Sequence, residues 1–254
     1  MRIGLLAAIT AVGLAAVAAD CATAADVRVS SIPFKGPLDQ IAPQFERATG
    51  HRLVVRYAPS EPLRKQIDAG EPFDVVLIFP NVVDDLIRQR KISAGTRVDI
   101  ARAGLGLAVR KGAAKPDIRS IDGFKRALLT SKSIAYAAQG PSGVHLAGVL
   151  ERLGIAQDVR PKLKPVGAGS LVVGPVASGD VEIGIVSIPF ILADAGAELA
   201  GPLPRELQDY VQYSSGMGRA VQDADAARTF VSYFGQPGAV EILRAHGLEA
   251  VGAR

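Results

Sequence analysis

The stretch Val75-Val76-Leu77-Ile78 is a continuous apolar run, and Ile183-Gly184-Ile185-Val186 has the same character later in the chain. A short strand that is apolar at every position is typical of a strand buried on both faces, as in a parallel sheet covered by helices on both sides. These two runs therefore predict buried strands and, with them, an α/β fold.

Predicted strands and helices alternate outward from these two runs. The assignment rests on apolar residues at helical or strand spacing, bounded by glycine, proline or polar turn residues. The expected strands are 27–31, 52–57, 75–78, 104–110, 133–137, 183–186 and 210–213. The expected helices pass through Leu38, Leu63 and Leu86, and then occupy 121–129, the segment from Gly143 to Gly154, 224–234 and 239–245.

Alternating strands and helices without a flexible linker predict two lobes that are joined by crossing strands rather than by a tether. The natural crossing points are 104–110 and 210–220. We expect each lobe to be a mostly parallel sheet flanked by helices. One lobe would comprise 25–105 plus 215–254, and the other would comprise 106–214.

The first residues of the chain have the pattern of an export signal. Arg2 supplies a minimal positive charge, the apolar run 3–19 follows, and Ala22-Thr23-Ala24 fits the small-x-small rule for cleavage. We predict a signal peptide over 1–24 and a mature protein that is soluble, globular and located in the periplasm.

The sequence contains one cysteine, Cys21. Asp20 precedes it, where a lipid-attachment signal needs a small residue. Cleavage after Ala24 would leave a mature chain without cysteine, which excludes disulfides and thiolate metal sites. A lipid anchor on Cys21 remains the alternative, because the sequence does not settle whether this residue leaves with the signal peptide.

Charge and histidine placement disfavour several classes of function. The net charge is +4, and the lysines and arginines are scattered without a basic run, so nucleic acid is not an expected partner. The histidines form no metal-binding pattern, and Ser142 with His145 lacks the third member of a catalytic triad. We expect no metal, no cofactor and no enzymatic activity, whereas the mild positive charge is compatible with a small anionic ligand.

Hydroxyls and glycines follow several of the predicted strands. In open α/β sheets, ligands bind beyond the carboxyl ends of the strands, where helix N-termini present free N–H groups. A serine at a helix start usually serves only to cap the helix, but here five turns of this kind all follow the ends of predicted strands. The turns predict a site for a small anion held by neutral donors, built from Ser31, Ser60, Ser142 with Gly143, Gly169 with Ser170, and Ser187.

Longer motifs carry a resemblance that spans the chain from the first predicted strand onward. Four motifs follow one another along the chain: Ala58-Pro59-Ser60 with LRKQIDAG at 63–70, Pro141-Ser142-Gly143, Pro161 to Pro165, and the closing YFGQPGAVEILRAHGL at 233–248. The chain resembles the molybdate-binding proteins of ABC importers, which have the two-lobed type II periplasmic-binding-protein fold. The resemblance implies an ABC permease in the inner membrane that recognises the closed form. We expect closure on the ligand to be a hinge motion, and we expect a monomer.

The resemblance also implies roles for individual residues. Ser60 matches a serine whose hydroxyl and backbone contact the oxyanion, while Ser142 and the Gly169-Ser170 turn match positions that donate backbone N–H groups. Two positions depart from the family. Its first-strand serine aligns with Pro33, which has no N–H, and its second-lobe tyrosine aligns with the shorter Ser187.

Three classes of function remain open, and they differ in the ligand or in what happens to it. A tetrahedral oxyanion such as molybdate or tungstate is the first, and it would use the neutral donors described above. The second is a small organic carboxylate, with Lys35 or Arg219 as its counter-charge. The third is an enzyme in the same fold that acts on a small anion.

Overall fold

The computed structural model describes residues 26–31, 34–138 and 140–251. The first part contains β1 (Asp26–Ser31), α1 (Lys35–Thr49), β2 (Arg52–Tyr57), α2 (Ser60–Asp68), β3 (Val75–Ile78), α3 (Pro80–Arg88) and β4 (Val98–Arg110). The middle contains α4 (Ile121–Thr130), β5 (Ile134–Ala137), α5 (Pro141–Arg152), α6 (Ala156–Val159), β6 (Leu163–Val166), α7 (Val173–Ser178), β7 (Ile183–Ser187), α8 (Ile188–Leu192) and β8 (Ala197–Pro202). The chain closes with β9 (Tyr210–Met217), α9 (Ala224–Tyr233), α10 (Pro237–Ala245) and β10 (Glu249–Ala250).

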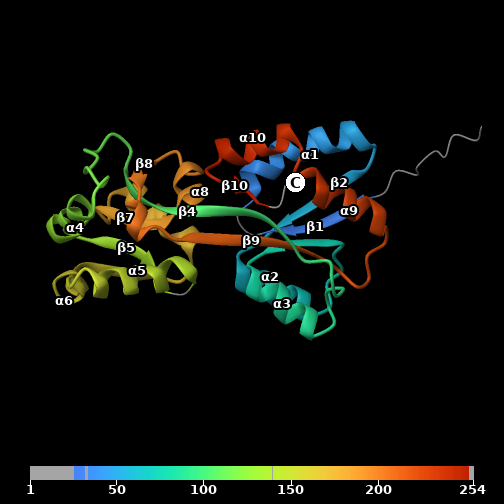
Figure 1. The fold of residues 1–254 in the computed structure, drawn as a ribbon, viewed down its shortest axis with the longest axis horizontal. Helices are drawn as coiled ribbons and strands as arrows, with labels where there is room; N and C mark the ends of the chain where they lie inside the picture. The colour runs from blue at the N-terminus through green and yellow to red at the C-terminus, as the bar shows by residue number, and fades with distance from the viewer. Residues whose placement is uncertain (1–25, 32–33, 139, 252–254) are drawn as a thin grey trace, which may run out of the picture.

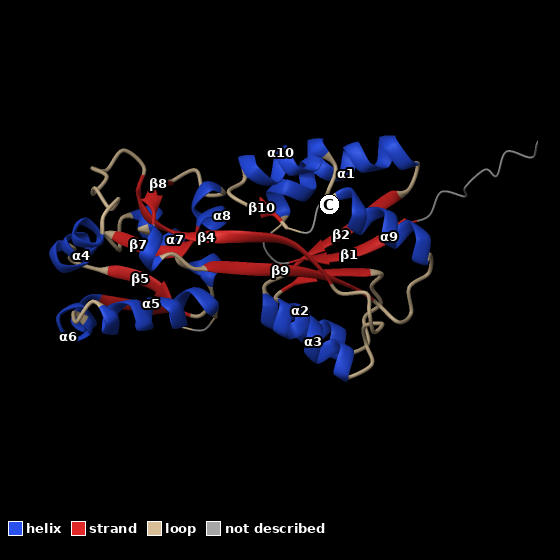
Figure 2. Ribbon diagram, viewed as in Figure 1, coloured by secondary structure: helices blue, strands red, loops and turns tan. Residues whose placement is uncertain are grey.

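The strands form one extended sheet in the order β2-β1-β3-β9-β4-β7-β5-β6, with β8 and β10 also paired to β4. Two parallel triplets, β2-β1-β3 and β7-β5-β6, stand at its two ends. The long strands β4 and β9 run between them (Figure 2). Helices cover both faces: α2 and α3 lie on one side of the first triplet, and α1 and α10 lie on the other (Figure 1).

Register shows that β4 changes partners midway. Its residues 98–104 pair with β9, and its residues 105–110 pair with β7 and β8. Both parts are antiparallel to their partners. The predicted strand 104–110 therefore begins earlier than expected, at Val98, because pairing with a strand more than a hundred residues away extends it. Local sequence patterns do not contain that information.

The two parallel triplets point their carboxyl ends toward each other. Ile78, the last residue of β3, pairs with Ser214 of β9, whose preceding residues lead toward the second triplet. Ser187, the last residue of β7, pairs with Leu105, whose preceding residues lead toward the first triplet. The other strands of each triplet are parallel to β3 or β7. Both ligand-binding edges therefore face the same central region, which β4 and β9 cross.

A side-chain clamp stabilises this crossing. The amide of Gln208 accepts a hydrogen bond from the backbone N–H of Leu105 at 2.8 Å and donates one to its carbonyl at 3.0 Å. Gln208 thus acts as a neighbouring strand would, at the residue where β4 changes partners. The backbone of the crossing is satisfied even though the regular pairing is interrupted there.

An ion pair between the buried carboxylate of Asp74 and the partly exposed Arg28 fixes the first triplet to the chain that follows β9. Asp74 accepts hydrogen bonds from Arg28 Nε at 2.9 Å, from Arg28 Nη2 at 2.6 Å, and from the backbone N–H groups of Arg28 and Gln222. Burial alone raises the pKa of Asp74, but the guanidinium and the two N–H groups outweigh it, so the pKa lies below its ordinary value. The carboxylate therefore stays charged in the folded protein.

Replacing this carboxylate should destabilise the fold. We expect Asp74→Asn to lower the free energy of unfolding by about 3 kcal/mol at neutral pH, because it leaves the Arg28 guanidinium without its charge partner. A lowered folded-state pKa contributes stability above the unfolded pKa and loses it as pH falls through the folded pKa. The difference between the proteins should thus be complete above about pH 5 and shrink in acid.

Urea unfolding followed by circular dichroism measures this effect. Asp117→Asn is the matched control, because Asp117 pairs with Arg119 on the open surface, and its unfolding midpoint should hardly move. Equal midpoints for Asp74→Asn and Asp117→Asn would contradict the role given to the buried pair.

Candidate functional site

The carboxyl edge of the first triplet contains two of the predicted site residues. Ser31 ends β1 and is fully buried, and its hydroxyl has no hydrogen-bond partner among the described residues. Its carbonyl accepts from the N–H of Ala58, which draws the chain after β2 across the end of β1. Ser60 is the first residue of α2, and Pro59 occupies the cap position before it. Pro33 lies outside the described residues.

The facing edge, on the second triplet, contains the other predicted residues. Ser142 and Gly143 form the first turn of α5, directly after β5, and both are buried. Gly169 and Ser170 form a short 3-10 turn after β6, where Ser170 is exposed. Ser187 ends β7 and is 2% exposed. The predicted residues of each lobe thus lie on one edge, and the two edges face each other.

Gly143 sets how closely α5 approaches the sheet. A Cβ at this position would lie 1.7 Å from the carbonyl oxygen of Ala137, the last residue of β5. No side chain fits in that space. The first turn of α5, with the free N–H groups of a helix start, is consequently held tightly against the strand end.

Tyr213, on β9, lies between the two edges. Its ring makes an edge-to-face contact with Phe34 at 5.5 Å between centroids and stacks on Phe79 at 5.7 Å. Phe34 precedes α1, and Phe79 follows β3, so both belong to the first edge. Burial raises the pKa of Tyr213, and the nearby Ser187 hydroxyl, at the second edge, lowers it by a smaller amount.

No normal hydrogen bond satisfies the Tyr213 hydroxyl within the described part of the chain. The approach of Ser187 is therefore a proximity rather than a well-formed bond. Sequence reasoning missed Tyr213, because a single tyrosine in an expected strand has no local signal. Only the register of β9 against β3 and β4 reveals that it lies beside the carboxyl end of β3.

The structure treats the two predicted counter-charges differently. Lys35 begins α1 near the first edge, but its Nζ is 2.7 Å from the carboxylate of Asp39, which also accepts from the hydroxyl of Tyr57 at 3.0 Å. The Lys35 hydrogen bond is the main cause of the lowered pKa of Asp39. Lys35 is therefore already paired with an anion of this chain.

Arg219 is not brought to the site. The residue before it donates its N–H to the carbonyl of Asp74, and Arg219 itself donates to the carbonyl of Lys91. These contacts place Arg219 at the amino end of β3, at the opposite end of the strand from Phe79. Its backbone therefore lies away from the carboxyl edge of the first triplet.

His145 does not form a catalytic pair with Ser142. Its Nε2 lies 2.7 Å from the carbonyl of Leu207, and its Nδ1 lies 3.4 Å from the carboxylate of Asp209. Within the described ranges, no group of three or more His, Cys, Asp or Glu side chains is arranged to hold a metal ion. No helix in the same ranges is long and apolar enough to cross a membrane.

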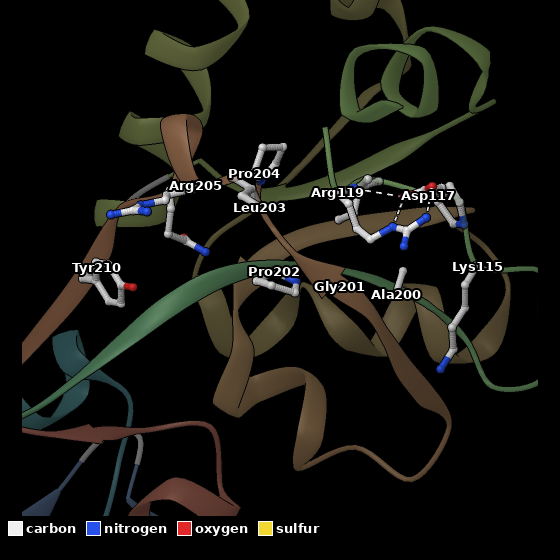
Figure 3. A pocket seen from close by; sticks show the side chains of 13 residues that line it. Lys115, Asp117, Arg119, Ala200, Gly201, Pro202, Leu203, Pro204, Arg205 and Tyr210 are labelled. Carbon is white, nitrogen blue, oxygen red and sulfur yellow. Dashed lines mark hydrogen bonds and ion pairs between the residues drawn. The ribbon is translucent and has the colours of Figure 1, made fainter. Parts of the chain in front are cut away.

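A separate surface hollow of about 820 Å³ lies in the second lobe (Figure 3). Its basic side chains include Lys115, which pairs with Glu198 at 2.9 Å, and Arg119, which pairs with Asp117 at 2.7 Å. None of the predicted site residues lines it. Since two of its cations are paired with carboxylates, it offers a weaker attraction for an anion than its lysine and arginine content suggests.

Comparison with known proteins identifies the family. The model of the bacterial extracellular solute-binding proteins matches residues 27–249. A protein of Pseudomonas sp named aconitate isomerase is 31% identical over 89% of this chain and 88% of its own length. The molybdate-binding protein of Azotobacter vinelandii is 29% identical over 89% of this chain and 90% of its own length.

Solved structures agree on the fold. The periplasmic molybdate-binding protein of Azotobacter vinelandii has a TM-score of 0.70 at 24% identity, covering 87% of this chain and 98% of that one. The substrate-binding domain of a molybdenum ABC transporter from Clostridium difficile, described as putative, has a TM-score of 0.73 at 20% identity, covering 90% and 100%. The predicted α/β class, its two-lobed architecture and the resemblance to molybdate-binding proteins are confirmed.

One expectation is contradicted. The sequence predicted that the chain is not an enzyme, because it contains no recognisable catalytic motif. The relative named aconitate isomerase overturns that expectation, since it matches over nearly the whole chain. The lack of a catalytic motif does not exclude an enzyme, because a site made of neutral donors contains none of the patterns by which hydrolases and metalloenzymes are recognised.

The family assignment covers both edges of the site and the strands that join them. Because the matching family model extends from β1 to β10, the chain belongs to the bacterial extracellular solute-binding proteins.

Proposed function

We propose that this protein captures a small anion between its two lobes and delivers it to an ABC permease. The observation that supports the proposal best is the opposition of the two carboxyl edges across β4 and β9. In this arrangement the starts of α2 and α5, one on each edge, are directed toward the same central region. Their N–H groups and dipoles favour negative charge.

Buried hydroxyls would complete the binding site. Ser31, Ser142 and Ser187 are 0%, 6% and 2% exposed, and they come from both edges. Hydroxyls and backbone N–H groups can surround an anion without placing a buried positive charge in the site, which would be costly to desolvate when the site is empty. Lys35 is paired with Asp39 and is not needed as a counter-charge in this proposal.

The same proposal extends to the lobe boundaries, the export, the oligomeric state and the closure of the protein. The exchange of partners along β4 supports a lobe boundary near 105/106, and we propose the second boundary near 214/215. The predicted signal peptide over 1–24, which contains Cys21, lies outside the described residues; we propose that such a segment directs the protein to the periplasm. We further propose that the protein acts as a monomer, that the closed form is the one that the permease recognises, and that closure is a hinge motion about β4 and β9.

Two ligand classes have support from named relatives. Molybdate or tungstate is the first candidate, because several relatives are named molybdate-binding proteins. Aconitate or a similar small carboxylate is the second, because of the relative named aconitate isomerase. The second candidate brings a second function, isomerisation of the captured carboxylate.

A thermal-shift panel separates the two ligand classes. Molybdate, tungstate, sulfate, citrate and both isomers of aconitate are each added at fixed ionic strength, with chloride as the control. A ligand present at 100 times its dissociation constant stabilises the folded protein by about 2.7 kcal/mol, which is several degrees in melting temperature. We expect a shift with one of the two classes. If every anion behaves like chloride, the proposed function is wrong.

The same panel tests for turnover. An anion that shifts the melting temperature is incubated with the protein and recovered for chromatography. A transport receptor returns its ligand unchanged, whereas an isomerase converts one isomer of aconitate into the other in proportion to time and protein concentration. Conversion would establish the second function in place of the first.

Gly143 offers a test of the α5 edge. Gly143→Ala should weaken binding of the anion found in the panel by roughly tenfold or more, which is about 1.4 kcal/mol, because the new Cβ pushes the first turn away from Ala137. Gly148→Ala in the same helix is the matched control, since a Cβ there has no neighbour within 4 Å. The control should bind normally and gain up to about 1 kcal/mol of stability. Isothermal titration calorimetry measures both affinities. Equal affinities would argue against a ligand at the start of α5.

A further inference from the structure

Tyr213 has neighbours on both edges of the site. Its ring is held by Phe34 and Phe79 on the side of the first triplet, and its hydroxyl lies near Ser187 on the side of the second. Tyr213 itself belongs to β9, which runs through the crossing and pairs there with Ala101 of β4. It is therefore placed where a ligand held between the lobes would contact the hinge.

Two buried hydroxyl groups near this position lack hydrogen-bond partners. Both Tyr213 Oη and Ser31 Oγ are buried, and neither has a hydrogen-bond partner among the residues that the structure describes. A buried hydroxyl without a partner costs about 1–3 kcal/mol of desolvation free energy. Natural proteins rarely keep such groups unless they serve a purpose, and here two of them lie close to the same strand ends.

Packing of the ring alone does not explain why a tyrosine, rather than a phenylalanine, occupies position 213. Phenylalanine would fill the space among Phe34 and Phe79 equally well and would avoid the cost of burying a hydroxyl. The hydroxyl therefore adds nothing to the stability of the folded chain without a ligand. It becomes favourable when an acceptor of hydrogen bonds reaches it, and an anion in the cleft is such an acceptor.

We propose that Tyr213 is a ligand-binding residue whose phenol donates a hydrogen bond to the captured anion, with the Ser31 hydroxyl as a second donor. This inference rests on the proposed capture of an anion between the lobes and specifies how the hinge takes part. Burial keeps the phenol protonated at neutral pH, so it is a donor throughout the physiological range. Since the donor comes from a crossing strand, ligand binding is linked directly to the strand about which the lobes close.

The test compares Tyr213→Phe and Ser31→Ala with the unmodified protein in two measurements. The first is the melting temperature without ligand. The second is the dissociation constant for the anion with the largest shift in the panel, measured by titration calorimetry. Tyr233→Phe is the matched control, because Tyr233 lies on α9 and packs against Phe45. It should leave affinity unchanged.

We expect the melting temperature of unliganded Tyr213→Phe to equal or exceed that of the unmodified protein, because a buried unpaired hydroxyl is removed. Its affinity for the anion should fall roughly 10- to 100-fold, the usual worth of a hydrogen bond to a charged group. Ser31→Ala should behave in the same way. This combination of retained stability and lost affinity supports the proposal.

Two results would overturn it. A clear fall in the unliganded melting temperature of Tyr213→Phe would show that the hydroxyl is bonded inside the protein, and this measurement needs no ligand. An unchanged affinity would show that the phenol does not reach the anion. Failure of the proposed function is distinguishable, because in that case the unmodified protein itself responds to no anion in the panel.

Discussion

The antiparallel pairing of β3 with β9 and of β7 with β4 is the constraint on which the rest of the structure depends. Because β4 and β9 cross between the lobes in opposite directions, the strand that each pairs with in one lobe must end at the crossing. The other strands of each triplet are parallel to β3 or β7 and end there too. Two helix starts, several buried hydroxyls and the Tyr213 ring thereby meet in one region, although their residues are spread over most of the chain.

Much of this architecture is visible in the sequence. The apolar runs at 75–78 and 183–186 predict the two buried strands correctly, and Ser31 and Ser187 are found at strand ends as expected. These features are local, since burial on both faces requires a continuous apolar run whatever the partners are. The pairing of Lys35 could also be predicted from the sequence, because Asp39 lies four residues later on the same helix and neutralises its charge.

The remaining features depend on pairing across long distances. The first part of β4 contains Asp99 and Arg102 and gains its strand structure from β9. Tyr213 is placed by its contacts with Phe34 and Phe79 and by the nearby Ser187. Arg219 was expected as a possible counter-charge for a carboxylate, yet the direction of β9 carries it to the amino end of β3. Sequence patterns specify which residues are buried, but strand register determines which of them meet.

The proposed site of neutral donors would be compatible with a family whose members have different names. Hydroxyls and N–H groups can donate hydrogen bonds to many small anions, so a change of ligand would not require a change of fold. Capture is common to transport and to isomerisation of a bound carboxylate. The two functions differ in what happens before release.

Hydrogen–deuterium exchange with and without the bound anion tests the central claim most directly. A ligand held between the opposed edges should slow exchange at the starts of α2 and α5 together, in peptides that cover 60–66 and 141–147, and at the crossing residues 210–214. Protection confined to one lobe, or to the hollow lined by 115–119 and 200–205, would contradict the account.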